Sequence, residues 1–390
     1  MNKAYKFRLY PNTEQQILFA KTFGCVRFIY NRMLGDKIRH YEETKKYLKT
    51  TPAQYKKEFE WLKEVDSLAL ANAQLHLEVA YKNFFRDKNI GFPKFKSKHK
   101  GYNSYTTNLV NGNIMLINGY LKLPKLGLVK VKQHRDIPDN YKLKSVTVSK
   151  KSSGKYYVSI LYEYESKIIP VVVNSAVGLD FSMKELYVSS EGQTPNYPRP
   201  YRQTQAKLAK EQRKLSKRQK GGKNRAKQKI KVARLHEKVA NQRSDFLHKQ
   251  SRQITNALDA VCVEDLNMQG MSQVLNFGKS VSDNGWGMFV NMLAYKLLEQ
   301  GKQFVKIDKW FPSSKMCSVC GIIKPEITLS ERTYRCDCGL VCDRDVNAAI
   351  NIKNEGIRIM NRRAYGDSLV NISTLVESSQ EAPASNAVRR

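Results

Sequence analysis

The stretch that decides the fold reads Ala176-Val177-Gly178-Leu179-Asp180-Phe181, a short apolar run that carries an acid near its end. Short apolar runs bounded by turn residues are typical of buried strands. Leu186-Tyr187-Val188 follows closely and is expected to form a hairpin with it. Two later segments, 260–264 and 304–307, share the apolar pattern, and helical periodicity occupies about 287–300 between them. The sequence therefore predicts an α+β domain, with helices packed on a mixed sheet.

Three acids fall where such a sheet brings chain segments together. Asp180 ends the first strand, Glu264 ends another, and Asp345 begins a helix expected from about Val346. Central strands can place Asp180 and Glu264 side by side, and a helix packed on the sheet can add Asp345. Converging carboxylates can hold two Mg²⁺ ions about 4 Å apart, and Mg²⁺ prefers oxygen ligands. The three acids are thus candidate catalytic residues and magnesium ligands, in the arrangement of the RNase H-like nuclease fold.

Simpler roles compete for each acid. An acid can end a strand, and Asp is a favoured residue at the N-cap of a helix, which applies to Asp345 in particular. Asp265 follows Glu264 directly and should therefore point to the opposite face of its strand. Asp343 is expected to support the helix cap or a neighbouring turn. The residues alone leave the catalytic and the structural interpretations open.

Five of the seven cysteines crowd into residues 317–342. Two close pairs of thiolates suit tetrahedral zinc, and Gly321 and Gly339 follow the pairs where tight turns need backbone freedom. The alternative is a set of reduced buried cysteines, and the nearby Cys342 leaves some doubt about the fourth ligand. Four sulfur ligands leave no open coordination position, so the zinc is expected to be structural. The predicted ligands are Cys317, Cys320, Cys336 and Cys338.

The charge of the chain points to a polyanionic partner. Lys and Arg number 68 against 35 Asp and Glu, a formal net charge of +33. Nucleic acid is the usual partner of such a surplus, because each phosphate contact releases a counterion. No apolar run approaches the roughly 18 residues of a membrane-spanning helix, and no secretory signal follows Met1, so no membrane partner is predicted.

The surplus of positive charge is densest between residues 201 and 250, a segment with 17 Lys and Arg and only 3 Asp and Glu. This segment is predicted to form basic helices over 203–257, broken at Gly221-Gly222. Most charge runs are solvated helix faces, but this density favours contact with RNA or DNA. The candidate contacts are Lys214, Lys217, Arg218, Lys220, Arg225 and Lys249.

The N-terminal half combines a strand, helices and a strand-rich region. A strand at 5–10 precedes helical patterns that run through about Asp36 and over 51–86, and Thr13 with Gln16 can form a capping box. Leu68, Ala71, Leu75 and Val79 recur at helical spacing and predict one buried face. Polarity then alternates with period two over about 104–165. The expected architecture is a small β-barrel or curved sheet, split by a helical module.

Aromatic residues interleave with lysines near the junction of these regions. Phe92, Phe95, Tyr102 and Tyr105 alternate with Lys94, Lys96, Lys98 and Lys100. Such a mixture suits contact with a nucleic-acid backbone and stacking on unpaired bases. Half of these aromatic residues can equally be core, and Trp286 is expected to be core.

By these residues the chain resembles TnpB, the RuvC-like protein family of insertion sequences that is similar to type V CRISPR effector nucleases. Singly each matching segment is modest, but together they are specific and follow the family's order over about residues 3–355. The segments are Phe7-Arg8-Leu9-Tyr10-Pro11-Asn12, Phe28-Ile29-Tyr30-Asn31, Tyr81-Lys82-Asn83-Phe84-Phe85, Gly91-Phe92-Pro93-Lys94-Phe95, Asp245-Phe246-Leu247-His248-Lys249, Val263-Glu264-Asp265-Leu266, Gly285-Trp286-Gly287, Phe311-Pro312-Ser313-Ser314-Lys315 and Asp343-Arg344-Asp345-Val346-Asn347-Ala348-Ala349-Ile350-Asn351-Ile352.

The resemblance implies an RNA-guided DNA endonuclease of a transposable element. A guide RNA from the element's end pairs with double-stranded target DNA, the protein recognises a short flanking motif, and the RuvC site cuts. The family's catalytic acids fall on Asp180, Glu264 and Asp345, and its zinc motif on the four cysteines. Residues 51–71 and 104–107, with Tyr105 and Thr107, are the segments expected to recognise the motif. The implied location is the prokaryotic cytoplasm, at the nucleoid.

The implied domains divide the chain as follows: a β-barrel from 1–10 and 104–170, a helical recognition module at 11–103, a RuvC-like nuclease domain from 171–312 and 341–370, a zinc-binding insertion at 313–340 and a disordered tail at 371–390. Three other functions remain open. The chain can be a catalytically silent RNA-guided repressor, a transposase that joins DNA ends, or a zinc-ribbon RNA-binding protein. The oligomeric state is not predicted.

Overall fold

The computed structural model describes residues 1–87, 89–98, 101, 103–268, 270–271, 283–328 and 331–365. The chain forms two compact units, which are described separately. Unit 1 comprises Met1–Ser166 and Lys229–Arg234, and unit 2 comprises Lys167–Gln228 and Leu235–Arg390. The tail expected at 371–390 lies outside the described residues.

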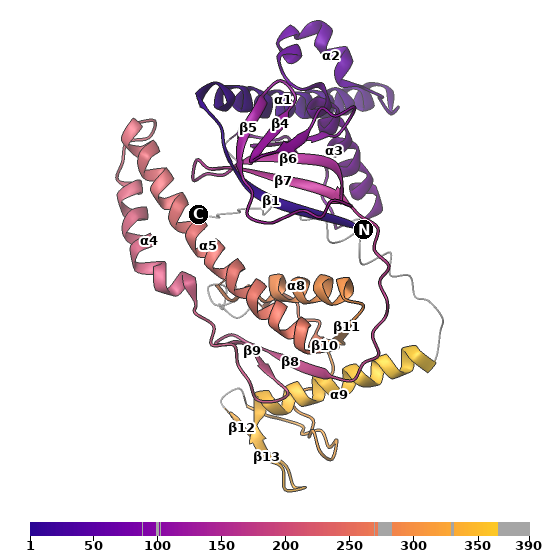
Figure 1. Cartoon of the computed structure of the whole chain (residues 1–390). Coiled ribbons are helices and arrows are strands. Elements are labelled where there is room, and N and C mark those ends of the chain that lie inside the picture. The colour runs from indigo at the N-terminus through magenta and orange to yellow at the C-terminus, as the bar shows by residue number, and fades with distance from the viewer. Residues whose placement is uncertain are drawn as a thin grey trace. The chain divides into compact units, whose positions relative to one another are not determined.

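Unit 1 is built on a seven-stranded antiparallel sheet in the order β2-β6-β7-β1-β5-β4-β3 (Figure 1). The first strand lies in the middle of the sheet, and the helices are inserted between it and the second strand. This is the split sheet that the sequence predicts, with β2 and β3 as its edges. The strands are β1 (Asn2–Tyr10), β2 (Ser104–Asn108), β3 (Met115–Ile117), β4 (Tyr120–Leu123), β5 (Gly127–Lys132), β6 (Lys142–Lys150) and β7 (Tyr156–Glu163).

The inserted helices are α1 (Thr13–Thr44), α2 (Pro52–Glu58), the 3₁₀ turn η1 (Glu60–Glu64) and α3 (Ser67–Arg86). The capping box of α1 is formed by Asn12 and Gln15, not by Thr13 and Gln16 as the sequence suggested. The Asn12 side chain accepts from the Gln15 backbone N–H at 2.8 Å, and the Gln15 side-chain oxygen accepts from the Asn12 backbone N–H at 3.1 Å. Asn is favoured at the N-cap of a helix at least as strongly as Thr, so the residue types alone did not indicate which of the two residues caps α1.

The buried face of α3 differs from the predicted one. Ala69, Leu70, Ala73 and Leu77 are buried, whereas Leu75 and Val79 are 48% and 53% exposed. The helix carries two apolar stripes at the same spacing. Packing against α1 and β2 selects the stripe that contains Leu70 and Leu77, which joins the core shared with the sheet.

Unit 2 is built on a four-stranded sheet in the order β11-β10-β8-β9. The strand β10 (Ala260–Glu264) is parallel to both neighbours, β8 (Ala176–Ser182) and β11 (Gln303–Ile307). The hairpin partner β9 (Leu186–Ser189) runs antiparallel to β8, as the sequence predicts. Two central parallel strands, β8 and β10, therefore end at the same edge of the sheet.

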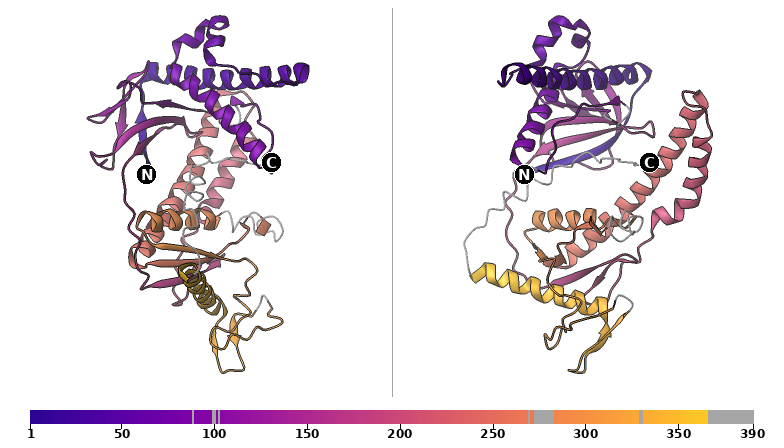
Figure 2. Two further views of the ribbon diagram at one scale, coloured as in Figure 1. Left: turned by 90° about the vertical axis from the view of Figure 1, so that its right-hand side faces the viewer. Right: turned by 180° about the vertical axis from the view of Figure 1, so that it is seen from behind.

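The helices α8 (Trp286–Glu299) and α9 (Arg344–Tyr365) lie on opposite faces of this sheet (Figures 1 and 2). Side chains alternate along a strand, so Val261 and Val263 pack toward Trp286 and Phe289 of α8. On the other face, Cys262 packs with Ile352 of α9. Trp286 is 2% exposed and belongs to the core, as expected.

Two glycines allow α9 to lie close to the sheet. A Cβ on Gly178 of β8 would overlap the carbonyl oxygen of Ala349 and lie 2.6 Å from the Lys353 nitrogen. A Cβ on Gly356 of α9 would overlap the sulfur of Cys262 and lie 2.7 Å from its Cβ. These approaches fix where the first turn of α9 reaches the sheet.

The basic segment forms two helices, α4 (Pro200–Ser216) and α5 (Lys223–Ala257), with the break where the two glycines were expected. A two-stranded sheet of β12 (Thr333–Arg335) and β13 (Val341–Asp343) precedes α9. Among the described residues, no helix is both long and apolar enough to cross a lipid bilayer.

Candidate metal centres and nucleic-acid interface

Asp180 and Glu264 lie side by side at the edge where β8 and β10 end. The register pairs Leu179 with Val263, so the two acids are the next residues along two neighbouring parallel strands. Alternation places Asp180 on the same face as Gly178, and Glu264 on the same face as Cys262. That face is covered by α9, so both carboxylates point toward the helix that carries the third acid.

Asp345 lies in the first turn of α9, and its cap is supplied by a different residue. The Asp343 carboxylate accepts from the backbone N–H groups of Asp345 at 2.8 Å and Val346 at 3.1 Å. Asp343 therefore holds the helix end, as expected, and the Asp345 carboxylate is not used for capping. We call Asp180, Glu264 and Asp345 the carboxylate site.

The electrostatics of the carboxylate site show that its members are close. Burial raises the pKa of Asp180 well above its usual value, and the charges of Glu264 and Asp345 raise it further. Burial also raises the pKa of Glu264, whose carboxylate accepts a hydrogen bond from the hydroxyl of Ser313. The nearest cations to Asp345 are Arg344 at 3.6 Å and Arg332 at 3.8 Å. The buried Asp180 carboxylate, repelled by two neighbouring acids, is a group whose charged form a divalent cation would stabilise.

The carboxylate site is wider than the cysteine site. Within the described part of the chain, only the four cysteines place three or more metal-ligand atoms all within 4.8 Å of one another. The three carboxylates are more widely spaced than this.

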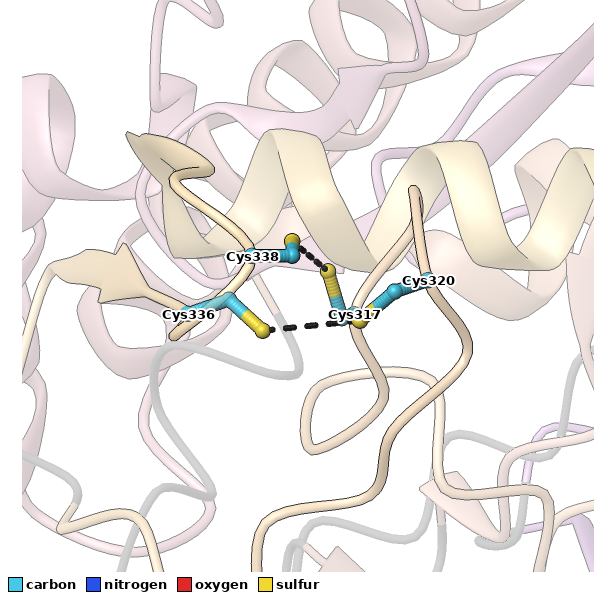
Figure 3. A group of neighbouring side chains, drawn as sticks. All are labelled: Cys317, Cys320, Cys336 and Cys338. Atoms are coloured by element: carbon cyan, nitrogen blue, oxygen red, sulfur yellow. Dashed lines mark hydrogen bonds between the residues drawn. The ribbon is translucent and has the colours of Figure 1, made fainter.

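The cysteine cluster, Cys317, Cys320, Cys336 and Cys338, gathers as the spacing predicts (Figure 3). The sulfur atoms of Cys317 and Cys338 lie 3.6 Å apart, as do those of Cys320 and Cys336. Tetrahedral zinc with Zn–S bonds of about 2.3 Å requires sulfur separations of about 3.8 Å. The four-cysteine cluster is thus consistent with structural zinc, and Cys338, rather than Cys342, completes it.

Local turns present the sulfurs of the cysteine cluster. Gly321 and Gly339 have φ angles of +77° and +94°, the left-handed conformation that glycine adopts without strain. Burial opposes ionisation of Cys317, but backbone N–H groups of Cys320 and Val319 and neighbouring thiols lower its pKa to about 6. A thiolate formed near neutral pH favours metal entry, since zinc binds deprotonated sulfur.

The proposed nucleic-acid contacts on α4, on α5 and in the connection between them fall into three groups. Lys217, Arg218 and Lys220 are exposed. Lys214 pairs with Glu211 at 2.9 Å and Lys249 with Asp245 at 2.7 Å, on exposed surfaces where such pairs exchange readily. Arg225 has a structural task, because its guanidinium donates to the carbonyls of Leu215 and Arg218 at 2.7 and 2.9 Å and ties α4 to α5.

The two candidates on β2 do not present their side chains to a ligand. Tyr105 is 2% exposed and Thr107 is 0% exposed, both in the interior of unit 1. Alternation along the strand turns every second residue inward, which composition alone did not reveal. Phe92 and Phe95 are 43% and 55% exposed and remain available for stacking. Lys100 and Tyr102 lie outside the described residues.

Three residues that hold these sites in place, Ser313, Asn347 and Asn351, were not among the predicted site residues. Ser313 binds Glu264 from within the Phe311-Pro312-Ser313-Ser314-Lys315 segment, and that segment was the only signal for it. Asn347 accepts from the Ser318 backbone at 3.0 Å and donates to the Met316 carbonyl at 2.7 Å. Asn351 donates to the carbonyls of Ser313 and Met316 at 2.8 and 2.7 Å. Helix α9 therefore holds both the carboxylate site and the first cysteine turn.

Three family profiles match successive parts of the chain. They are described as "Helix-turn-helix domain" over residues 1–46, "Probable transposase" (OrfB of IS605) over 159–275, and "Cas12f1-like, TNB domain" over 286–352. In the first of these, residues 2–10 form a strand and residues 13–44 one continuous helix, so the matched segment does not fold as its description says.

Whole-length relatives agree with the profiles. The chain is 37% identical over 367 residues to an inferred RNA-guided DNA endonuclease of Streptomyces pristinaespiralis, covering 92% of this chain and 90% of the relative. It is 32% identical over 381 residues to InsQ of Escherichia coli K12, also an inferred RNA-guided DNA endonuclease, covering 92% and 93%. A solved complex of Cas12f1 with sgRNA and target DNA shares the fold, with a TM-score of 0.58 at 12% identity, covering 91% and 99%.

These matches, together with the RuvC-like sheet and the four-cysteine cluster, define the class as a Cas12f-like α+β nuclease fold with a TNB zinc-finger domain. Within that class, the chain belongs to the TnpB family, the RNA-guided DNA endonucleases of IS605-type transposons.

Proposed function

We propose that this protein cuts DNA next to a short flanking motif, at a target selected by a guide RNA from the element's end. The observation that carries the proposal is the convergence of Asp180, Glu264 and Asp345 at one end of an RNase H-like sheet. The membership of the chain in the TnpB family supports the same reaction.

Within the proposal, the carboxylate site holds magnesium. The donor set fits, because hard carboxylate oxygens are the ligands that Mg²⁺ prefers and repulsion around Asp180 favours a bound cation. Asp180, Glu264 and Asp345 would hold the Mg²⁺, which when bound would activate water and stabilise the leaving oxygen of the phosphodiester. The chain's own residues orient the carboxylates: the β8–β10 register aligns Asp180 with Glu264, Ser313 fixes one Glu264 oxygen, and Asp343 leaves Asp345 free of capping.

The cysteine cluster would hold one structural zinc ion. Its four sulfurs leave no position for water or substrate, so the zinc is assigned no step in the reaction. Its contribution is to fix the turns that Asn347 and Asn351 attach to α9.

We also propose the finer domain division. The split sheet of unit 1 corresponds to the barrel at 1–10 and 104–170 with its inserted recognition helices at 11–103. The exposed lysines and arginines around 217–220 line the path of the heteroduplex backbone, which the protein holds by charge while base pairing selects the sequence. We propose that exposed side chains of residues 51–71, in unit 1, recognise the flanking motif.

The test uses protein co-expressed with the DNA that flanks its own gene. Bound RNA is sequenced, and the complex is incubated with Mg²⁺ and plasmids that carry a guide-matched target beside randomised bases. We expect cleavage that depends on the match, on one flanking motif and on Asp180. Target binding without cleavage would indicate an RNA-guided repressor, strand-transfer products a transposase, and RNA binding without target DNA a zinc-ribbon RNA-binding protein.

A further inference from the structure

Trp310 is the most exposed of the large apolar side chains near the carboxylate site. Its side chain is 80% exposed, whereas the other two tryptophans, Trp61 and Trp286, are 42% and 2% exposed. A tryptophan is usually largely buried because its ring has the greatest apolar area of any side chain. An indole left in water on an ordered loop therefore marks a surface for a ligand.

The loop that carries Trp310 is attached to the strand residue Glu264 at both of its ends. The last residue of β11, Ile307, pairs with Glu264 in the sheet, and the Asp265 backbone donates to the Ile307 carbonyl at 3.2 Å. Ser313 donates its hydroxyl to the Glu264 carboxylate. Trp310 is three residues from each of these anchors, and three residues span at most about 11 Å. The Trp310 Cα therefore lies within about 11 Å of the Cα atoms of both anchors, a separation that a few nucleotides of one DNA strand can span.

The loop itself is held in a defined conformation. The Trp310 and Phe311 backbones donate to the side chain and carbonyl of Asp308 at 2.7 and 3.1 Å. Phe311 packs into the core on the α9 side of the sheet. The Ser313 carbonyl accepts from Asn351 of α9 at 2.8 Å. Anchors on both sides of Trp310 keep the ring from collapsing into the core.

The charge beside the ring selects the kind of ligand. The Lys309 ammonium lies 5.0 Å from the centroid of the Trp310 ring, and its side chain is exposed. An aromatic face next to a cation suits a nucleotide, whose base stacks while its phosphate pairs with the cation. An apolar protein partner would gain nothing from Lys309 at this point.

We propose that Trp310 stacks on an unpaired base of the DNA strand that enters the carboxylate site, and that Lys309 contacts the adjoining phosphate. This inference rests on the proposed nuclease function. Stacking at a fixed distance from the carboxylates would set the position of the scissile phosphate. Trp310 is accordingly a substrate-binding residue whose loss weakens cleavage without altering guide RNA binding.

Tryptophan fluorescence tests the contact directly. A Trp61→Phe background leaves the buried Trp286 and the exposed Trp310 as reporters, and Trp310→Phe in that background supplies the blank. RNA-bound full-length protein is titrated with oligothymidylate in the absence of Mg²⁺. We expect quenching that is present in the background protein and absent when Trp310 is also replaced.

Cleavage assays test the consequence on a guide-matched target with Mg²⁺. One stacked base is worth roughly a tenfold effect or more, so we expect Trp310→Ala to slow cleavage at subsaturating DNA by about that factor. Trp310→Phe should largely restore the rate, and the cleavage position should become less uniform in Trp310→Ala. Val172→Ala, at a side chain of unit 2 that is 77% exposed and outside the proposed sites, is the control.

Four outcomes distinguish the stacking proposal from the proposed nuclease function on which it rests. Quenching by DNA with slowed cleavage in Trp310→Ala supports the proposal. Absence of DNA-dependent quenching, with a normal rate for Trp310→Ala, overturns it. Quenching by the bound RNA alone, unchanged by DNA, also overturns it and assigns the ring to the guide. If the unaltered protein does not cut but DNA quenches Trp310, the nuclease function fails while the stacking surface stands.

Discussion

The carboxylate site and the cysteine cluster differ in how far apart their members lie along the chain. The cysteines span only residues 317–338, and two glycine-bearing turns bring them together. The acids span residues 180–345 and meet because two parallel strands share a register and a helix crosses their ends. A local site depends on a few dihedral angles, whereas the carboxylate site depends on the packing of unit 2.

The two sites nevertheless share one helix. Asn347 and Asn351 of α9 hold the backbone of the first cysteine turn, and Asp345 of the same helix belongs to the carboxylate site. Loss of a cysteine ligand should therefore change the geometry of the carboxylate site only by shifting α9. The following predictions test this contrast between a local and a tertiary site.

The largest effect is expected from Glu264→Ala compared with Asp265→Ala. Metal ligation contributes several kcal/mol of transition-state stabilisation, so Glu264→Ala should lower the cleavage rate by about 10³-fold or more. Asp265 points away and pairs with Lys306 at 3.0 Å on the surface, so its loss should change the rate less than about threefold. Single-turnover cleavage gives both rates. Equal losses in the two variants would contradict the assignment of Glu264.

Gly178→Ala should disrupt the carboxylate site through packing alone. The added methyl group meets the α9 backbone, which cannot move as a side chain can, so we expect a destabilisation of about 3 kcal/mol and a loss of cleavage. Gly287→Ala is the control, because no atom lies within 4 Å of its added Cβ, and helix propensity should make it neutral or slightly stabilising. Urea denaturation gives the free energies. A Gly178→Ala protein as stable as the control would show that α9 does not lie this close.

Cys338→Ser should release zinc, whereas Cys342→Ser should retain it. Only the first replaces a sulfur of the cysteine cluster. Zinc content per chain after dialysis distinguishes them, with about one ion retained in Cys342→Ser. We expect cleavage by the Cys338→Ser protein to fall by about tenfold, since its metal ligands elsewhere remain and only the α9 anchor is loosened. Full activity without zinc would show that the two sites are independent.

The smallest effect is expected from Asp180→Asn on the metal-free protein. Because the pKa of Asp180 is raised in the fold, its charged form costs stability at neutral pH and this cost disappears as the pH falls below the usual aspartate range. Removing the charge should raise Tm by roughly 2–4 °C at pH 7. Added Mg²⁺ should stabilise the unaltered protein and leave Asp180→Asn nearly unchanged. A lower Tm of the Asp180→Asn protein in the absence of Mg²⁺ would contradict the destabilising role assigned to the Asp180 charge.

Several predictions from the sequence failed where two packings were equally compatible with it. The helical pattern of α3 allowed two apolar stripes, and the stripe with Leu75 and Val79 proved to be the exposed one. Tyr105 and Thr107 were predicted to contact nucleic acid, but strand alternation turns both inward. Arg225 remains a predicted nucleic-acid contact, and the structure adds a bond from its guanidinium to the Leu215 carbonyl that the sequence did not indicate. In each case the residue type was suitable and the neighbours decided its role.

The sequence by itself determined what depends on short-range geometry: the strands of unit 2, the break in the basic helices, the cysteine pairs and the turns after them. It also suggested the three acids as candidates, but their separation along the chain did not indicate how close they lie in space. Only the tertiary structure decided which face of each strand meets α9, that Asp343 rather than Asp345 caps that helix, and that Ser313 reaches Glu264. The physical reason is that successive side chains of a strand point to opposite faces of the sheet. The role of each side chain therefore depends on which element packs on its face, and that element lies far away in the sequence.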